Sequence, residues 1–348
     1  MPVSASDAIA GCLMGGAVGD AMGLPFEGLS PRRITRLRKG PLQYRFFFGH
    51  GMVSDDTDHA IFVTQSLIKS EGDVSKFKKS LAWRLRLWLI CLPAGVGFAT
   101  LRSIIKLWLG FKNNGVYSAG NGPSMRSAMI GAILSNDASA RHAHVLASTL
   151  LTHTDPKAFT GALAIAEIAA RLVNQEWQTR PPLNELISML SNLSDDAEWQ
   201  AVVKGIKESC LAPDPVLIAQ NHFGGKHGIS GYTMHTVPFA IIAWYLHFGS
   251  YYDTIDAVVN AGGDVDSVAA IAGALAGASV GLTGIPQEWR DGLMDWPHSR
   301  QYLQTLARKV NDPEVKAGLY FSFWLFPRNI IFLVIVLLHG FRRLLPPY

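Results

Sequence analysis

Two segments with small side chains on every side constrain the fold of this chain more than any other feature. They cover residues 8–22 and 266–282, and both have apolar residues at helical spacing without a polar face to turn to water. Because glycine and alanine let neighbouring backbones approach closely, we expect both helices to be buried all round. They are predicted to form the centre of the molecule.

Helical spacing also dominates the rest of the chain, whereas the alternation typical of strands is scarce. Clusters of Gly and Pro at residues 92–97, 113–123, 179–182 and 212–215 indicate loops. The sequence predicts one all-α domain, a compact single-domain helical bundle, over residues 4–312. Its helices are expected near residues 5–22, 55–70, 75–91, 97–110, 124–134, 139–152, 157–173, 182–192, 197–209, 234–248, 252–260 and 266–282.

The composition excludes several classes of protein. Hydrophobic residues make up 49% of the 348 positions and charged residues 17%, a balance that indicates a packed core and not a disordered chain. The formal net charge of +4 is scattered, without the basic stripe and interleaved aromatics of a nucleic-acid-binding protein. Cys12, Cys91 and Cys210 share no C-x-x-C spacing, which argues against disulfides and thiolate metal sites and indicates a reducing cytoplasm.

The last segment, residues 313–348, differs in character from the predicted domain. It contains the run Leu319–Phe341, in which Arg328 is the one full charge. A spanning helix needs roughly 20 apolar residues, and Pro327 with Arg328 interrupts this run near its middle. We expect the tail, residues 318–348, to be embedded in or to lie on the inner face of a membrane. A full span and a helix docked on the domain's own surface are the alternatives.

An acidic cluster stands at the start of the helix predicted at residues 55–70. Asp55, Asp56 and Asp58 crowd around the hydroxyl groups of Ser54 and Thr57, immediately before an apolar run. One explanation is a helix N-terminus, with Ser54 as the N-cap and the carboxylates favoured by the helix dipole. That explanation needs no function.

A second acidic cluster stands at the start of the helix predicted at residues 266–282, where Asp264 and Asp266 accompany Ser267. This helix has no polar face to carry charge into water, and burying an ionised carboxylate costs on the order of several kcal/mol. No basic residue adjoins either cluster, and oxygen ligands of this kind suit Mg²⁺, Mn²⁺ or Ca²⁺. The sequence therefore predicts a binuclear metal site shared by the two helix starts.

Five segments in the same order resemble the ADP-ribosylglycohydrolase family, which includes dinitrogenase-reductase-activating glycohydrolase and the ADP-ribosyl-acceptor hydrolases. The resemblance implies an all-α fold with two divalent cations, usually Mg²⁺ or Mn²⁺, at the base of a cleft. The segments are GCLMGGAVGDAMGLPFEG at 11–28, GMVSDDTDHAIF at 51–62, SAGNGPSMR at 118–126, LTHTDP at 151–156 and NAGGDVDSVAAIAGALAGASVG at 260–281.

The resemblance also assigns roles to individual positions. Glu27 corresponds to a glutamate on a flap beside the metals, the 120–122 loop passes close to the ADP-ribose, and His153 lies near the distal ribose. A solvated turn, a plain turn and a core histidine are the structural alternatives for these three. The implied metal ligands are Ser54, Asp55, Asp56, Asp264, Asp266 and Ser267, and the loop residues are Gly120, Asn121 and Gly122.

Two features depart from the family pattern or compete with it. The family more often has Thr where this chain has Ser54 and Ser267, and a serine hydroxyl can ligate the same ion. His142 and His144 could suggest a zinc site with His153, but an exposed helix face is the expected arrangement for the first two residues.

The function implied is a metal-dependent hydrolase that cleaves the glycosidic bond between ADP-ribose and a protein side chain, arginine above others. The reaction passes through an oxocarbenium-like state, and divalent ions can hold the ribose hydroxyls and lower the pKa of a bound water. Either Asp56 or Glu27 would orient or deprotonate that water. The alternatives are a non-catalytic ADP-ribose-binding or toxin-blocking protein, and a hydrolase of small ADP-ribose derivatives.

Overall fold

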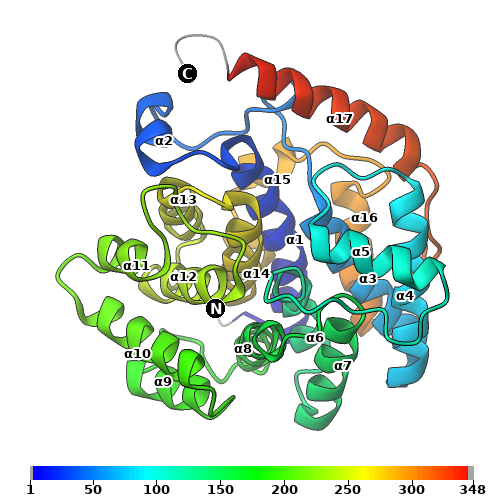
Figure 1. Cartoon of the computed structure of the whole chain (residues 1–348), viewed down its shortest axis with the longest axis horizontal. Coiled ribbons are helices and arrows are strands. Elements are labelled where there is room, and N and C mark those ends of the chain that lie inside the picture. The colour runs from blue at the N-terminus through cyan, green and yellow to red at the C-terminus, as the bar shows by residue number, and fades with distance from the viewer. Residues whose placement is uncertain (1–2, 344–348) are drawn as a thin grey trace.

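The computed structural model describes residues 3–343, and within them all regular structure is helical, with isolated β-bridges but no strand (Figure 1). The predicted all-α class is therefore confirmed. The helices are α1 (Ala5–Gly23), α2 (Pro31–Leu37), α3 (Asp55–Ser70), α4 (Val74–Ile90), α5 (Phe98–Trp108), α6 (Ala128–Ile133), α7 (Ala138–Leu150), α8 (Pro156–Val173), α9 (Leu183–Ser191), α10 (Ala197–Leu211), α11 (Pro215–Phe223), α12 (Thr233–Leu246), α13 (Tyr251–Ala261), α14 (Val265–Gly284), α15 (Gln287–Gly292), α16 (Arg300–Asn311) and α17 (Leu325–Arg342).

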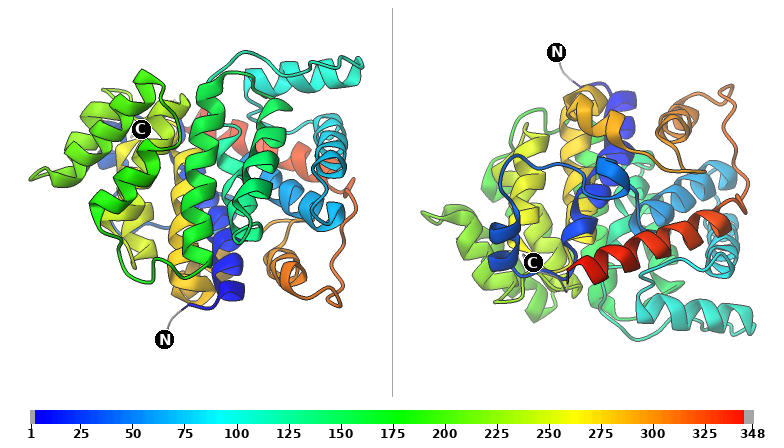
Figure 2. Two further views of the ribbon diagram at one scale, coloured as in Figure 1. Left: turned by 90° about the horizontal axis from the view of Figure 1, so that it is seen from below. Right: turned by 90° about the horizontal axis from the view of Figure 1, so that it is seen from above.

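Helices α1 and α14 lie side by side at the centre of the molecule, as their small residues predict (Figures 1 and 2). Their backbones approach so closely that glycine is required at the contact. A Cβ atom on Gly19 would lie 2.1 Å from the carbonyl oxygen of Ala269, and one on Gly11 would lie 2.1 Å from that of Gly277. The two helices are buried along most of their length.

The other helices surround this pair in two groups. Helices α9 to α13 lie on one side, and α3, α4, α5 and α16 lie on the other, while α6, α7 and α8 close the end shown at the bottom of Figure 1. Fully buried side chains such as Trp88, Trp199 and Trp244 fill the layers between them. The site described below lies at the N-terminal ends of α3 and α14, between the two groups of helices.

The predicted helical segments agree with the structure to within a few residues. The segment predicted at 124–134 forms a short 3₁₀ turn, Ser124–Arg126, followed by α6. Helices α2, α11, α15 and α16 are not among the predicted segments. Helix α16 buries just Leu303, Leu306 and Ala307 on a narrow stripe, so its polar majority obscured the periodicity.

The C-terminal tail forms α17, which lies across the top of the domain in Figure 1; residues 344–348 of the predicted tail lie outside the described residues. Arg328 donates to Asp295 at 3.0 Å, and the Asn329 amide donates to the carbonyl oxygen of Cys91 at 2.9 Å. Within residues 3–343, three helices are long and apolar enough to cross a membrane. The segments at α1 and α14 are mostly buried in the domain, whereas 22% of the segment at α17 is buried. Membrane attachment and the division at residues 312 and 313 stay predictions.

Gly19→Ala is expected to destabilise the protein by about 1–3 kcal/mol or more, because the new methyl group would collide with the backbone of Ala269. Urea unfolding followed by circular dichroism measures the effect. Gly16→Ala is the matched control on the same helix, since its Cβ would lie 3.5 Å from the nearest atom. The control is expected to change stability by less than about 1 kcal/mol, in the stabilising direction because alanine favours helix. Equal stability of both variants would contradict the close backbone contact.

Candidate metal centre

The start of α3 is held by a buried carboxylate from the central helix α1. Asp20 Oδ2 accepts hydrogen bonds from the Ser54 backbone N–H at 2.8 Å, from the Thr57 backbone N–H at 3.2 Å and from the Thr57 hydroxyl at 2.6 Å. Ser54 caps the helix, because its hydroxyl oxygen accepts from the Asp56 N–H at 3.3 Å. The N-cap explanation for Ser54 is thus correct, and the cap is locked to the centre of the fold.

The start of α14 is built where three chain segments meet at Gly263. Its N–H donates to the carbonyl oxygen of Leu29 at 2.9 Å, and the Asp264 N–H donates to the carbonyl oxygen of Ile229 at 2.7 Å. Gly263 has a φ of +90°, and a Cβ atom there would lie 2.0 Å from the Ile229 oxygen, so glycine is required. This junction brings the turn that carries Glu27 to the start of α14.

The two acidic clusters meet across the site. The Ser267 hydroxyl donates to Asp56 Oδ2 at 3.2 Å, and Ser54 donates to the same oxygen at 3.1 Å. The Asn121 amide donates to Asp264 Oδ2 at 2.6 Å, which joins the 120–122 loop to the start of α14. Residues from three segments far apart in the sequence therefore converge.

One cavity of about 330 Å³ collects most of the predicted site residues. Ser54 and Asp56 are not among its lining residues, and both are buried. Phe98 and Thr100 of α5 also line it, from a stretch without a family motif. The predicted residues in the lining are Glu27, Asp55, Gly120, Asn121, Gly122, His153, Asp264, Asp266 and Ser267.

Burial and mutual repulsion raise the pKa of the carboxyl groups in this site. The pKa values of Asp55, Asp56 and Asp266 lie well above the ordinary value, first because of burial and then because of neighbouring carboxylates. Burial raises the pKa of Asp264 as well, although the hydrogen bond from Asn121 opposes the shift. A cluster of this kind takes up either protons or cations.

Two further carboxyl groups, the buried Asp20 and the exposed Glu27, show the same trend. Burial raises the pKa of Asp20 to about 6, against hydrogen bonds from Thr57 and Ser54 that lower it. Glu27 lies exposed at the rim, and its pKa is raised by partial removal of the carboxyl group from water and then by Asp264, while Arg343 lowers it. The rise in pKa thus extends from the buried floor of the site to its rim.

Unpaired oxygen atoms test whether divalent cations fit this site. Asp56 Oδ1 and Asp266 Oδ1 are buried and have no hydrogen-bond partner. Carboxylate and hydroxyl oxygens without partners are the ligands that Mg²⁺ and Mn²⁺ prefer. Within residues 3–343, however, no three His, Cys, Asp or Glu side chains already stand in the arrangement of a metal-binding group. The site fits cations by chemistry, and the two-metal site stays a prediction.

His153 lies against the loop that it was predicted to accompany. A Cβ atom on Gly120 or Gly122 would lie 3.1 Å from the imidazole ring, so the loop passes directly over it. The His153 Nδ1 and the Thr152 hydroxyl oxygen are 2.8 Å apart. Burial, and then the charge of Arg126, lower the pKa of His153 to about 3. The histidine is therefore neutral at physiological pH and supports the wall of the cavity.

The sequence analysis missed two buried residues that organise the site. Asp20 lies within the first family segment, and its place in a helix without a polar face was an available signal. Arg126 is fully buried and donates to Ser148 Oγ at 2.9 Å and to Thr152 Oγ1 at 2.7 Å, next to His153. It is the last residue of the family segment at 118–126, but no local periodicity separates it from a surface arginine.

Other titratable residues from the sequence analysis lie away from the site. Asp58 accepts from the Trp88 indole N–H at 3.0 Å, and its Oδ1 lies 2.7 Å from His298 Nδ1, so it belongs to the core. The expectation of an exposed face for His144 is wrong, because the ring is buried against Phe77.

Comparisons with known proteins identify relatives over most of the chain. The family model described as ADP-ribosylglycohydrolase matches residues 1–318. An uncharacterised protein of Archaeoglobus fulgidus is 29% identical over 86% of this chain and 94% of its own length. The ADP-ribosyl-[dinitrogen reductase] glycohydrolase of Rhodospirillum rubrum is 26% identical over 82% of this chain and 90% of its own. The ADP-ribosylarginine hydrolase Tri1 of Pseudomonas putida is 26% identical over 89% and 80%.

The fold has a counterpart among solved structures. A chain of an ADP-ribosylglycohydrolase-related protein complex superposes with a TM-score of 0.67 and 24% sequence identity. The match covers 88% of this chain and 98% of that one. This likeness supports the all-helical architecture.

Asp266→Asn is expected to raise the melting temperature in EDTA at pH 7, because it removes a buried charge that Glu27, Asp264 and Asp56 repel. A carboxyl group whose pKa is raised in the fold costs stability above its unfolded pKa, about 3.9, and the cost disappears as the pH falls. The melting temperature should rise by about 2 °C or more at pH 7, which corresponds to ~1 kcal/mol in the free energy of unfolding. This rise should become smaller towards pH 4. Differential scanning calorimetry at both pH values measures it.

The exposed Glu288 of α15 provides the control for this prediction. Glu288→Gln removes one acidic charge outside the site and should leave the melting temperature almost unchanged at both pH values. A lower melting temperature for Asp266→Asn at pH 7 in EDTA would show that the carboxylate stabilises the cation-free site.

Proposed function

The chain belongs to the ADP-ribosylglycohydrolase family, and we propose that it is a metal-dependent hydrolase that removes ADP-ribose from protein side chains. Arginine is the proposed acceptor, because a relative that matches 89% of this chain is named an ADP-ribosylarginine hydrolase. The proposal places the reaction in the cytoplasm, in keeping with the cysteine spacing.

One observation carries the proposal: buried carboxylates with unpaired oxygens meet beside a cavity that is also lined by a glycine-rich loop. The unpaired atoms belong to Asp56 and Asp266. The loop, residues 120–122, lines the same cavity as Asp266. Hydrolysis of the glycosidic bond to ADP-ribose needs both features, a cation site at the ribose and an open backbone surface at the nucleotide.

The ligands of the two divalent cations, Mg²⁺ or Mn²⁺, would come from both helix starts. When bound, the cations would hold ribose hydroxyl groups and lower the pKa of a water molecule. The hydrogen bonds from Ser54 and Ser267 orient Asp56, and Asn121 orients Asp264. The ligand residues are Ser54, Asp55, Asp56, Asp264, Asp266 and Ser267.

Glu27 is the better placed of the two candidate bases. Its side chain lines the cavity, whereas Asp56 does not, and Asp56 Oδ2 already accepts two hydrogen bonds from serine hydroxyls. In the proposed reaction the water oxygen attacks the anomeric carbon and the bond to the guanidinium nitrogen breaks. Glu27 takes the proton from water, and the leaving nitrogen is protonated in return.

The remaining walls of the cavity suit the nucleotide portion of the substrate. Gly120 and Gly122 present backbone without side chains, and His153 supports them from behind. Phe98 lines the same cavity and is 86% exposed, which offers a ring for contact with the adenine base. This residue comes from the stretch outside the family motifs, where differences in substrate choice are expected.

Replacing Asp264 and Asp266 together by alanine is expected to abolish release of ADP-ribose from an arginine-modified protein. EDTA should abolish the activity of the unmodified enzyme, and added Mg²⁺ or Mn²⁺ should restore this activity. The same cations should not restore activity to the double variant. Release is measured by chromatography of free ADP-ribose, with arginine-linked, serine-linked and small ADP-ribose derivatives as parallel substrates.

Full activity of the double variant would contradict the proposed metal centre. Glu288→Ala, an exposed acidic residue on α15, is the control and should remain active. If the unmodified protein binds ADP-ribose tightly but releases none from any substrate, the non-catalytic binding alternative holds. Turnover of small derivatives alone would favour the other alternative.

Glu27→Gln is expected to lower kcat by about 100-fold or more, as for loss of a general base, with Mn²⁺ affinity nearly unchanged. Asp56→Asn should instead weaken Mn²⁺ binding, because Asp56 lies in the buried cluster. Steady-state kinetics and calorimetric Mn²⁺ titration of both variants separate the two roles. The opposite pattern, with Glu27→Gln active and Asp56→Asn slow but fully able to bind Mn²⁺, would assign the base to Asp56.

A further inference from the structure

Helix α17 buries Arg328 and Asn329 against the domain, beside the apolar Leu325 and Phe332, and leaves many of its other apolar residues exposed to solvent. Arg328 and Asn329 are 2% and 1% exposed. An amphipathic helix on a water-soluble domain has the reverse arrangement. The apolar residues that it leaves 38–64% exposed are Ile330, Ile331, Leu333, Val334, Leu337, Leu338 and Phe341.

The buried side of α17 is fixed to the domain by several specific contacts. Arg328 forms a buried salt bridge with Asp295, and also donates to the carbonyl oxygen of Val53 at 2.5 Å. The Asn329 amide donates to Cys91, and His339 Nε2 lies 3.1 Å from the carbonyl oxygen of Pro25. These contacts hold the helix flat along the surface, so its apolar side cannot turn inwards. Within residues 3–343, these apolar side chains remain exposed.

Aromatic side chains extend the apolar surface beyond the start of α17. Tyr320, Phe323 and Trp324 are 86%, 61% and 71% exposed in the segment that leads into the helix. Tyrosine and tryptophan are enriched where a protein meets the interface of a bilayer. The exposed surface therefore has the composition of an interfacial helix with aromatic residues at its entry.

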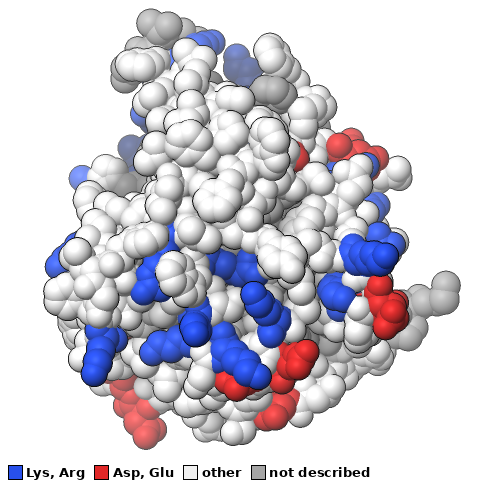
Figure 3. Space-filling model, turned by 90° about the vertical axis from the view of Figure 1, so that its right-hand side faces the viewer, with Lys and Arg blue, Asp and Glu red and all other residues white. Residues whose placement is uncertain are grey.

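The neighbouring surface is rich in Lys and Arg, although Asp and Glu side chains lie along the lower edge of the same face (Figure 3). No Asp or Glu occurs between Val74 and Asn136 or after Glu314, and these stretches include α4, α5 and α17. Figure 3 faces the side where α4, α5 and the first turns of α17 lie, and shows a band of Lys and Arg below an uncharged region. Apolar surface bordered by basic residues is complementary to an anionic membrane surface.

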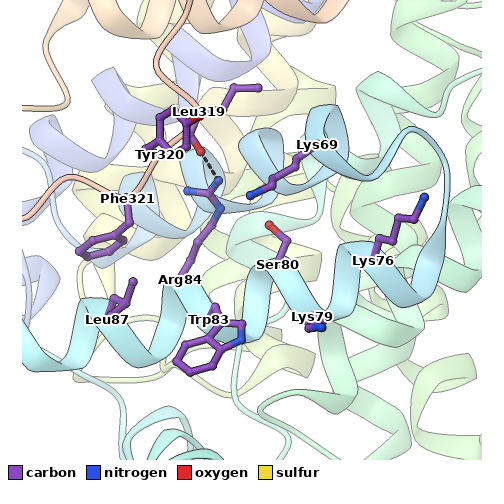
Figure 4. A pocket seen from close by; sticks show the side chains of 10 residues that line it. All are labelled: Lys69, Lys76, Lys79, Ser80, Trp83, Arg84, Leu87, Leu319, Tyr320 and Phe321. Atoms are coloured by element: carbon purple, nitrogen blue, oxygen red, sulfur yellow. Dashed lines mark hydrogen bonds between the residues drawn. The ribbon is translucent and has the colours of Figure 1, made fainter.

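A pocket of about 440 Å³ lies within this basic band, between α3, α4 and the segment at residues 319–321 (Figure 4). Lys69 and Lys79 line it, Trp83 and Phe321 supply apolar walls, and Arg84 donates to the carbonyl oxygen of Leu319. A cationic pocket with apolar walls fits the phosphate and the first carbons of a phospholipid headgroup.

We propose that α17 and the basic band of α4 dock this protein on the surface of a bilayer that contains anionic phospholipids. The apolar side of α17 enters the interface, and the lysines of α4 meet the phosphate groups. Helix α17 lies outside residues 1–318, which the family model matches, and α4 lies within them. Neither helix lines the cavity of the hydrolase proposal, so the two proposals can fail separately. The helix lies in the plane of the membrane and does not span it, because Arg328 and Asn329 remain bonded to the domain.

Co-sedimentation of the full chain with vesicles tests the proposal. Vesicles of phosphatidylcholine with 30% phosphatidylglycerol should bind the protein. The affinity for vesicles of phosphatidylcholine alone should be lower by about tenfold or more. Val334→Asp with Leu338→Asp on the exposed side of α17 should lower binding about tenfold or more. Lys76→Glu with Lys79→Glu should lower binding to the anionic vesicles, as should 0.5 M NaCl.

The matched controls carry the same changes on α10 and α11, on the other side of the central helix pair (Figure 1). Leu211→Asp with Leu217→Asp alters exposed apolar residues, and Lys204→Glu with Lys207→Glu alters exposed lysines, and both should leave vesicle binding unchanged. Circular dichroism confirms that each variant is folded, so that lost binding is not lost structure.

Two outcomes would overturn the proposal. One is equal sedimentation of the unmodified protein with both kinds of vesicle, or no sedimentation with either. The other is the absence of vesicle binding together with a dimer in light scattering that Val334→Asp with Leu338→Asp dissociates. A second copy of the chain would then cover α17. Loss of vesicle binding in the α17 variant, with a monomer throughout, supports the membrane surface.

Discussion

The close backbone contact between α1 and α14 is the constraint on which the rest of the structure depends. At its end, a Cβ atom on Gly23 would lie 2.6 Å from the carbonyl oxygen of Val265, next to Asp266. The same contact places Asp20 of α1 where it accepts three hydrogen bonds from Ser54 and Thr57 at the start of α3. The starts of α3 and α14, which carry the acidic residues, are thereby fixed relative to the central pair. The carboxylates are held close together despite their mutual repulsion.

Much of this arrangement could be predicted from the sequence because its signals are local. The small-residue helices, the loops rich in Gly and Pro, and the acidic residues at two helix starts are patterns within a few residues of one another. The family segments then added a role for the 120–122 loop, which the local Gly and Pro residues indicate merely as a loop, and for His153, which has no local signal of its own. The structure brings Asp56 and Ser267 within hydrogen-bond distance, although 211 positions separate them in the chain.

Other features could not be predicted, because they depend on pairs that meet only in the fold. Arg328 interrupts an apolar run, which predicts a membrane segment, but its partner Asp295 lies in a loop without any distinguishing pattern. Arg126 is likewise an ordinary arginine in the sequence and a fully buried one in the fold. The role of a single charged residue depends on its tertiary contacts, whereas a repeated spacing of apolar residues can be recognised in the sequence. Short or strongly polar helices, such as α15 and α16, fall between these two cases.

The pairing of α1 with α14 also has a consequence for how the protein is made. The first helix leaves the ribosome long before its partner, and contacts between segments so distant in sequence form late and slowly. Until α14 is synthesised, the glycine surface of α1 has nothing to pack against, and the acidic residues at the start of α3 stand without their counterparts. A chain that ends before α14 therefore lacks both the central helix pair and the second half of the acidic cluster.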